Sequence, residues 1–149
     1  MSVVRDPQIP DEDDWRRLWS GYNAFYQVQI PEAVTAATWK RILEPTSPIF
    51  GRLVVYDAAI VGFSVSLLHE STWTAAPVCY LEDLFVDPNY RGRGLGRLLI
   101  QDLIDRAKVR GWSRLYWHTL ATNPARRLYD EFVAADDFVR YRLVFDRSL

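Results

Sequence analysis

Residues 80–105, with the sequence YLEDLFVDPNYRGRGLGRLLIQDLID, decide how this chain folds. Residues 80–86 are mostly apolar and predict a buried strand. It ends at Asp87-Pro88-Asn89, because proline cannot donate to a strand ladder and Asp and Asn favour turns. A glycine-rich run follows and leads into an apolar row at helical spacing, made of Leu95, Leu99, Leu103 and Ala107. The stretch therefore predicts a strand, a glycine-rich turn and a helix with a broad buried face.

The glycine-rich run, RGRGLGR over residues 91–97, predicts a phosphate site. Glycines at a helix start leave backbone N–H groups exposed where the helix dipole is positive, and such a terminus binds anions. An ordinary connection with solvated arginines is the alternative, but three glycines alternating with arginines favour phosphate binding. The predicted phosphate-binding residues are Arg91, Gly92, Arg93, Gly94, Leu95, Gly96 and Arg97.

The spacing of the glycines discriminates among phosphate ligands. A dinucleotide fingerprint needs a sixth-position glycine, but counting from Gly92 that position is Arg97, and the Gly-Lys-Ser/Thr of a Walker loop is absent. The pattern R-x-x-G-x-G over 91–96 instead resembles the acetyl-CoA pyrophosphate loop of the GCN5-related N-acetyltransferase (GNAT) superfamily. The longer run 80–96 resembles the diamine and polyamine acetyltransferase branch in particular, so the resemblance implies acetyl-CoA as co-substrate.

Length and composition narrow the class of protein. A chain of 149 residues predicts one domain over 1–149, and its net charge of −1 gives no basic field for nucleic acid or an anionic membrane. No apolar run reaches the roughly 20 residues of a membrane span, and the N-terminus is too acidic for a signal peptide. A single cysteine, Cys79, fits a reducing cytoplasm, and no Cys/His spacing predicts a metal site.

The remaining periodicities predict the order β-α-α-β-β-β-α-β-α-β. Strands are expected at 2–6, 50–56, 60–68, 80–86, 114–118 and 138–145, with helices between them; Gly62 marks a bulge or a close approach. Hairpin neighbours plus a βαβ unit predict an α/β (mixed α+β) fold, a central mixed sheet with helices on both faces. The resemblance implies the GNAT fold, whose two strands flanking the phosphate-loop helix splay apart to admit the pantetheine arm.

Two acids interrupt the strand before the loop. Because consecutive strand residues face opposite sides, either Glu82 or Asp83 is expected in an apolar environment, where desolvation raises a carboxyl pKa. A structural acid bonded to a nearby Arg, Trp or Tyr is the alternative. The resemblance implies that Glu82 accepts the proton of the attacking amine, directly or through water, and leaves Asp83 as a candidate for holding a cationic substrate.

The resemblance also implies roles outside the loop. Main-chain groups of Leu84, Phe85 and Val86 would pair with pantetheine, and residues 123–130 resemble the family's N-x-x-A-x-x-L-Y helix. Tyr129 is then the acid that protonates the leaving thiolate, and Asn123 contacts the cofactor. Asn123 lies one residue closer to Tyr129 than the family spacing, and Asp137 stands where the family has a glycine.

Together these features predict an acetyl-CoA-dependent N-acetyltransferase. The acceptor is a primary amine, either a small cationic amine such as a polyamine or a lysine-like group, and the absence of a nucleophile elbow favours direct transfer in a ternary complex. A non-catalytic CoA-binding regulatory module is the alternative, and an arginine-based nucleic-acid-binding domain is a third reading that the net charge disfavours. Analogy with relatives adds a possible homodimer.

Overall fold

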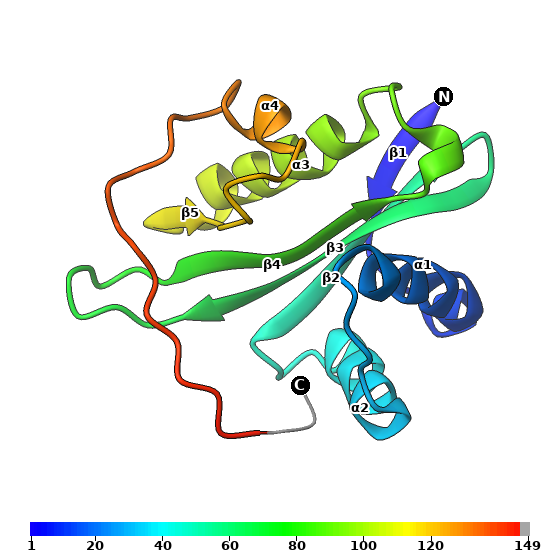
Figure 1. Ribbon diagram of the computed structural model, residues 1–149, viewed down its shortest axis with the longest axis horizontal. Coiled ribbons are helices and arrows are strands. Elements are labelled where there is room, and N and C mark those ends of the chain that lie inside the picture. The colour runs from blue at the N-terminus through cyan, green and yellow to red at the C-terminus, as the bar shows by residue number, and fades with distance from the viewer. Residues whose placement is uncertain (147–149) are drawn as a thin grey trace. The chain divides into compact units, whose positions relative to one another are not determined.

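The computed structural model describes residues 1–146 and divides the chain into two compact units, residues 1–117 and the part from His118 on. The first unit contains β1 (Ser2–Arg5), α1 (Glu12–Phe25), α2 (Glu32–Leu43), β2 (Ile49–Tyr56), β3 (Ala59–His69), β4 (Val78–Val86), α3 (Leu95–Arg110) and β5 (Arg114–Tyr116) (Figure 1). Short 3-10 turns precede α1 (Ile9–Asp11) and follow β4 (Pro88–Tyr90). The expectation of a single domain over 1–149 stays a prediction.

The sheet has the predicted mixed character. Its strand order is β1-β2-β3-β4-β5, and the first four strands pair antiparallel, whereas β4 and β5 are parallel and joined through α3. The parallel pairing covers only Val78–Tyr80 against Arg114–Tyr116. Beyond Tyr80, therefore, no described strand pairs with the β5-side edge of β4.

Helices cover both faces of the sheet, as predicted: α1 and α2 lie on one face and α3 on the other (Figure 1). The α1/α2 face carries an aromatic core in which Trp15, 1% exposed, stacks between Trp19 and Trp39 at ring-centroid distances of 5.2 and 5.3 Å. On the other face Leu95 and Leu99 pack with the sheet. Most of the aromatic residues of α1 thus serve packing.

A buried ion pair ties α3 to the sheet. Arg52 of β2 makes a two-pronged contact with Asp102 of α3, with Nε–Oδ2 and Nη2–Oδ1 distances of 2.8 and 2.9 Å. Planar guanidinium and carboxylate groups match in this arrangement, so it fixes orientation as well as distance. The middle of α3 is thereby held against the sheet.

The prediction for Gly62 is confirmed in the β2–β3 hairpin. Asp57 and Ala58 form its turn with positive φ values of 47° and 68°. Gly62 marks a close approach, since a Cβ atom there would lie 2.8 Å from the carbonyl oxygen of Phe85. Any larger residue would push β3 away from β4 at the end that leads into the loop.

The second unit differs from the sequence prediction. Its described helix is α4 (Arg126–Tyr129), shorter than expected, and the strand expected at 138–145 is wrong, since residues 138–146 form no strand. Side chains there alternate as in a strand, but a strand needs a partner for its backbone groups, and no described segment pairs with it. The strand expected at 114–118 also ends early, at Tyr116.

Candidate active site

A β-bulge in β4 determines where the two acids point. Across the β3–β4 ladder Val65 pairs with Asp83 and Ser66 pairs with Leu81, so Glu82 is an extra residue without an opposite partner. A bulge of this kind re-aims side chains. Asp83 and Tyr22 of α1 influence each other's pKa, and the charge of Arg41 of α2 acts on Glu82, so both acids lie toward the α1/α2 side.

The premise that Glu82 and Asp83 point to opposite faces is therefore wrong, because the bulge breaks the alternation. The expectation that one of the two acids lies in an apolar environment is still confirmed. Asp83 is 8% exposed, whereas Glu82 reaches solvent.

The environment of Asp83 makes its carboxyl group a weak acid. Burial is the main cause that raises the pKa of Asp83 to about 7; the hydroxyl of Tyr22 opposes the rise, and the charge of Glu82 adds to it. The pKa of the Tyr22 hydroxyl is raised in turn, first by burial and then by the charge of Asp83. At neutral pH, Asp83 is divided between its charged and neutral forms.

Glu82 has a milder shift in the same direction. Partial desolvation of its carboxyl raises the pKa of Glu82, and the positive charge of Arg41 opposes the rise. A carboxyl group with a raised pKa and access to solvent is suited to accept a proton from a substrate and to return it to water.

The edge of β4 that turns toward β5 offers backbone groups to a ligand. Leu84, Phe85 and Val86 pair with β3 on one side only, and the parallel pairing with β5 has already ended at Tyr80. Such a strand edge presents N–H and C=O groups that an extended ligand can pair with. The family resemblance of the sequence implied that these residues pair with the pantetheine arm of acetyl-CoA.

The glycine-rich loop forms an open cradle at the start of α3. Gly92 and Gly94 have φ values of 77° and 76°, and a Cβ atom at either residue would have no other atom within 4 Å. The N–H of Leu98 donates to the carbonyl of Gly94 at 3.0 Å, so the N–H groups of Leu95 and Gly96 come before the first helical bond and have no acceptor inside the helix. These backbone donors lie beside open space at the positively polarised end of the helix. Such an arrangement is suited to bind a phosphate group.

Aromatic rings support the arginines beside this cradle. The Arg91 guanidinium lies 5.4 Å from the ring centroid of Phe85, and its Nε donates to the Val86 carbonyl at 3.1 Å. Arg93 lies 5.2 Å from the ring centroid of Tyr56 and 6.0 Å from that of Tyr90. Within residues 1–146, neither arginine has a carboxylate within 4 Å, so their charge is available to an anion. The sequence analysis did not name Tyr56 or Tyr90 as part of the phosphate site.

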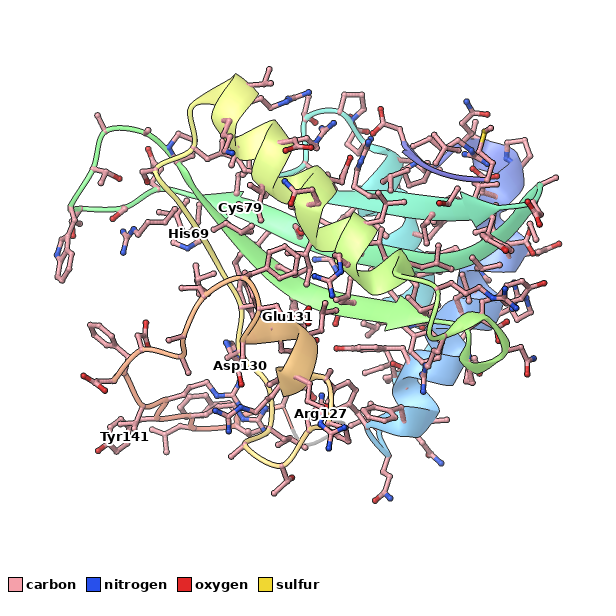
Figure 2. The ribbon with its side chains drawn as sticks, turned by 90° about the horizontal axis from the view of Figure 1, so that it is seen from above. His69, Cys79, Arg127, Asp130, Glu131 and Tyr141 are labelled. Carbon is pink, nitrogen blue, oxygen red and sulfur yellow. The ribbon has the colours of Figure 1, made fainter. Side chains whose placement is uncertain are left out.

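The predicted residues of the second unit occupy a local turn and helix. The Asn123 amide donates to the hydroxyl of Thr119 at 2.8 Å and accepts from the N–H of Ala125 at 2.9 Å, which holds the turn before α4. Tyr129 is the half-buried last residue of α4, followed by Asp130 and Glu131 (Figure 2). The roles of Asn123 and Tyr129 stay predictions.

The two histidines contact a tyrosine hydroxyl, a backbone carbonyl and an arginine. The His69 ring contacts the hydroxyl of Tyr116 at 3.0 Å and the carbonyl of Glu70 at 2.7 Å. His118 contacts Arg140 at 2.7 Å, and burial followed by the charge of Arg140 lowers its pKa. No group of three or more His, Cys, Asp or Glu side chains within residues 1–146 is arranged to hold a metal ion.

Sequence reasoning missed Tyr22 and Arg41. Tyr22 stands at helical spacing from Trp15 and Trp19, a pattern typical of core packing, and Arg41 belongs to the exposed side of α2. The signal that could have pointed to Tyr22 is the acid pair itself, since a buried carboxylate needs polar neighbours.

Residues 15–132 match the model of the acetyltransferase (GNAT) family. The chain belongs to the acetyltransferase (GNAT) family. Members of this family use acetyl-CoA as co-substrate, and the open cradle with its backbone donors and arginines fits the phosphates of that molecule. The protein is an N-acetyltransferase of the GNAT type, as the sequence predicted.

Two similar proteins are N-acetyltransferases by name. The chain is 33% identical over 144 residues to the D-amino-acid N-acetyltransferase HPA3 of Saccharomyces cerevisiae, covering 94% of this chain and 89% of that protein. It is 31% identical over 117 residues to the thialysine N-epsilon-acetyltransferase of Bos taurus, covering 78% of this chain but 59% of that protein.

Solved structures of acetyltransferases share the fold. A ribosomal-protein-alanine N-acetyltransferase from Brucella melitensis superposes with a TM-score of 0.81 at 22% identity, covering 97% of this chain and 100% of that one. An aminoglycoside acetyltransferase from a soil metagenomic sample also gives 0.81, at 18% identity and 97% coverage of both chains. Within the described residues, no helix combines the length and apolarity that a membrane crossing requires.

Proposed function

We propose that this enzyme transfers an acetyl group from acetyl-CoA directly to the primary amine of a small amino acid-like acceptor. The observation that carries the proposal is the bulge at Glu82, which turns two carboxyl groups with raised pKa values to one side of β4. They lie on the strand that leads into the open glycine cradle. The carboxyl groups suited to an amine acceptor thus lie on β4, and the cradle suited to a phosphate-bearing acetyl donor directly follows that strand.

Different groups of the chain bind different parts of acetyl-CoA. The N–H groups of Leu95 and Gly96, with Arg91, Arg93 and Arg97, hold the phosphates, while the backbone of Leu84–Val86 pairs with the extended arm. Acetyl-CoA, when bound, supplies an acetyl group activated as a thioester. In this proposal Asn123 adds a contact to the donor, as its position in the family motif implies.

Protons move through two side chains. An amine enters as its ammonium form, which the carboxylate of Asp83 attracts, and Glu82 accepts one proton so that the nitrogen lone pair becomes reactive. The new bond joins that nitrogen to the acetyl carbon while the bond from that carbon to sulfur breaks, and the hydroxyl of Tyr129 donates a proton to the departing sulfur. The nitrogen loses its second proton as the amide forms, and an equal proton taken up from solvent restores the hydroxyl of Tyr129. Glu82 then returns its proton to solvent, which completes the cycle without a covalent acyl-enzyme.

Charges of both signs on the α1/α2 side favour an amino acid over a polyamine. Arg41 is exposed, and α2 itself orients it, through contacts of 3.4 Å to the carbonyl of Ala37 and 3.2 Å to the hydroxyl of Thr38. A guanidinium opposite Glu82 provides a partner for an acceptor's carboxylate. D-amino acids and thialysine, the substrates named for two similar proteins, carry both an ammonium and a carboxylate group.

Thiol release from acetyl-CoA, measured against a panel of amines, tests this proposal. The panel contains D- and L-amino acids, thialysine, polyamines, aminoglycosides and lysine peptides, and calorimetry with CoA runs beside it. Turnover with free amino acids above polyamines is the expected result. Tight CoA binding without turnover on any amine would favour the regulatory module instead, and absence of CoA binding would contradict the cradle assignment.

A further inference from the structure

Asp87 begins the turn that joins β4 to the glycine cradle, and its backbone and carboxylate are all engaged in hydrogen bonds. Its N–H donates to the carbonyl of Val61 on β3 at 2.8 Å, and its carbonyl accepts from the N–H of Tyr90 at 2.9 Å. Its Oδ1 accepts from the N–H of Asn89 at 2.9 Å, and its Oδ2 accepts from Arg17 of α1 at 3.1 Å. Asp87 therefore fixes the direction in which the chain leaves the sheet.

Arg17 joins this turn to two other elements. Its Nη1 donates to the Asp87 carboxylate, whereas its Nη2 donates to the carbonyl of Ile60 at 3.0 Å. Ile60 precedes Val61, which accepts from the Asp87 N–H, so one guanidinium spans α1, the start of β3 and the turn after β4. A longer ion pair of 3.6 Å with Asp14 stays within α1. A guanidinium bonded at both of its ends fixes orientation as well as distance.

The turn leads directly into the residues proposed to hold the phosphates. Only residues 88–90 separate Asp87 from Arg91, and the Nε of Arg91 donates back to the carbonyl of Val86 at 3.1 Å. Glycine has the least restricted backbone of all residues, so the glycines that follow cannot hold the shape of the loop by themselves. That shape depends on the bonds made before them, at Asp87 and Arg91.

We propose that Arg17 and Asp87 are positioning residues for the acetyl donor, which together hold the glycine-rich loop in the conformation that receives the phosphates of acetyl-CoA. This inference rests on the proposed function, because it requires the cradle to bind those phosphates. It deepens that function by making α1 a support of the donor site. Both side chains act through the backbone of the turn, since a loop that is already in its binding conformation loses less entropy when the ligand binds.

The test compares the wild type with two substitutions of Arg17. Arg17→Ala removes the bridge, whereas Arg17→Lys keeps the charge but has a single nitrogen in place of the two that reach Asp87 and Ile60. Arg16→Ala is the matched control on α1, because Arg16 makes ion pairs of 2.8 Å with Glu12 and with Glu32, both outside the turn.

Calorimetry with CoA alone measures donor affinity without any acceptor. The Arg17 side chain is half exposed, so we expect both Arg17 variants to bind CoA about threefold to fivefold more weakly, the range of a partly exposed ion pair. Arg16→Ala should bind CoA like the wild type. In turnover assays KM for acetyl-CoA should rise by the same factor in the Arg17 variants, while kcat stays nearly constant. Wild-type affinity in Arg17→Lys would assign the effect to charge alone and overturn the inference.

A double-mutant cycle tests whether Arg17 acts through Asp87. In an Asp87→Asn background, Arg17→Ala should cost less CoA affinity than in the wild type, because the ion pair is already absent. An equal loss in both backgrounds would mean that Arg17 acts through another group, which contradicts the proposed role of Asp87.

Amide hydrogen exchange, followed by NMR without any ligand, observes the turn itself. The N–H groups of Asn89 and Tyr90 both donate to Asp87. We expect them to exchange about threefold faster or more in the Arg17 variants, because the turn opens more often, and at the wild-type rate in Arg16→Ala. Unchanged exchange in Arg17→Ala overturns the inference. If the wild type binds no CoA, the proposed function fails, but the exchange rates still decide whether Arg17 holds the turn.

Discussion

At the scale of single residues, Asp83 is buried at a cost to the fold. In the folded protein its carboxyl keeps a proton up to a pKa of about 7, whereas in the unfolded chain it loses that proton near pH 4. The folded state therefore binds more protons between these two pH values, and this group lowers the free energy of unfolding as pH rises through them. Functional groups are often retained at such a cost in stability.

Asp83→Asn removes that cost, because asparagine cannot ionise and has nearly the same shape as aspartate. We expect the variant to gain on the order of 2 kcal/mol in unfolding free energy near pH 8, with little gain near pH 4. Urea unfolding at both pH values measures the difference. Asp105→Asn, which replaces an exposed acid on α3, is the control. A gain that is equal at both pH values would contradict ionisation of Asp83 as its cause.

Glu82→Gln tests the base. The substitution preserves shape but removes the group that accepts a proton, so turnover should fall by about 100-fold or more. CoA affinity should stay unchanged, since Glu82 is not part of the cradle. The acidic limb of the pH–rate profile should also move, because the pKa of Glu82 is raised in the wild type. A profile identical to the wild type, measured by thiol release, would assign the base to another group.

Sequence reasoning at this scale is more specific where a residue type has one common use than where it has several. Glycines among arginines at a helix start favour anion binding, so residues 91–97 were predicted as a phosphate site; the structure shows open space at Gly92 and Gly94, and the phosphate contacts stay a prediction. Tyrosine on an amphipathic helix is usually a packing residue, and nothing in the local pattern of Tyr22 distinguishes its hydroxyl. Its influence on the pKa of Asp83 follows only from the tertiary contact with β4.

At the scale of elements, the decisive feature is how β4 meets its neighbours. Its bulge at Glu82 depends on the register against β3, and the early end of β5 depends on which residues of 114–118 find partners. Periodicity within one strand predicts the strand but not its register, because register is set by pairing between segments distant in sequence. The strand and the helix after it were therefore predictable, whereas the direction of the two acids was not.

Helix α3 offers a matched pair of glycines for testing the cradle. Gly94 and Gly111 flank the helix with φ values of 76° and 72°, and a Cβ atom at either position meets nothing within 4 Å. Alanine at each position should therefore cost a similar 1–2 kcal/mol or so in stability from backbone strain. Only Gly94→Ala places a methyl group at the helix start, where the phosphates bind, so only this variant should lose CoA affinity, by roughly tenfold or more.

Calorimetry with CoA and thermal unfolding of both variants separate the two effects. Equal destabilisation with a selective loss of CoA affinity in Gly94→Ala is the expected pattern. Equal CoA affinity in the two variants would mean that the phosphates do not occupy the open space at Gly94.

At the scale of the whole molecule, the chain's C-terminal part departs most from expectation. Alternation in residues 138–145 predicted a closing strand, but alternation records only that one side of a segment is apolar. Forming a strand also requires a free edge to pair with, which composition and periodicity cannot supply. Tyr141 instead projects from an extended segment (Figure 2), and it is 92% exposed.

The same segment provides a test of the proposed homodimer. Exposed large apolar side chains are concentrated in it, namely Phe138, Val139, Tyr141, Leu143, Val144 and Phe145. Several exposed apolar side chains in one short segment favour an interaction site, and strand-like alternation favours pairing with another strand. We propose that a second copy of the chain covers it.

Leu143→Lys should therefore weaken self-association, because a charged side chain would have to be buried at the contact between copies. Leu143 is 83% exposed, and Val109 on α3 is 86% exposed but stands alone, so Val109→Lys is the matched control. Sedimentation velocity over a range of protein concentrations should give dimers for the wild type and for Val109→Lys, and a shift toward monomers for Leu143→Lys. Monomers at every concentration in all three proteins would contradict the homodimer. Dimers that both lysine variants retain would move the contact to another surface.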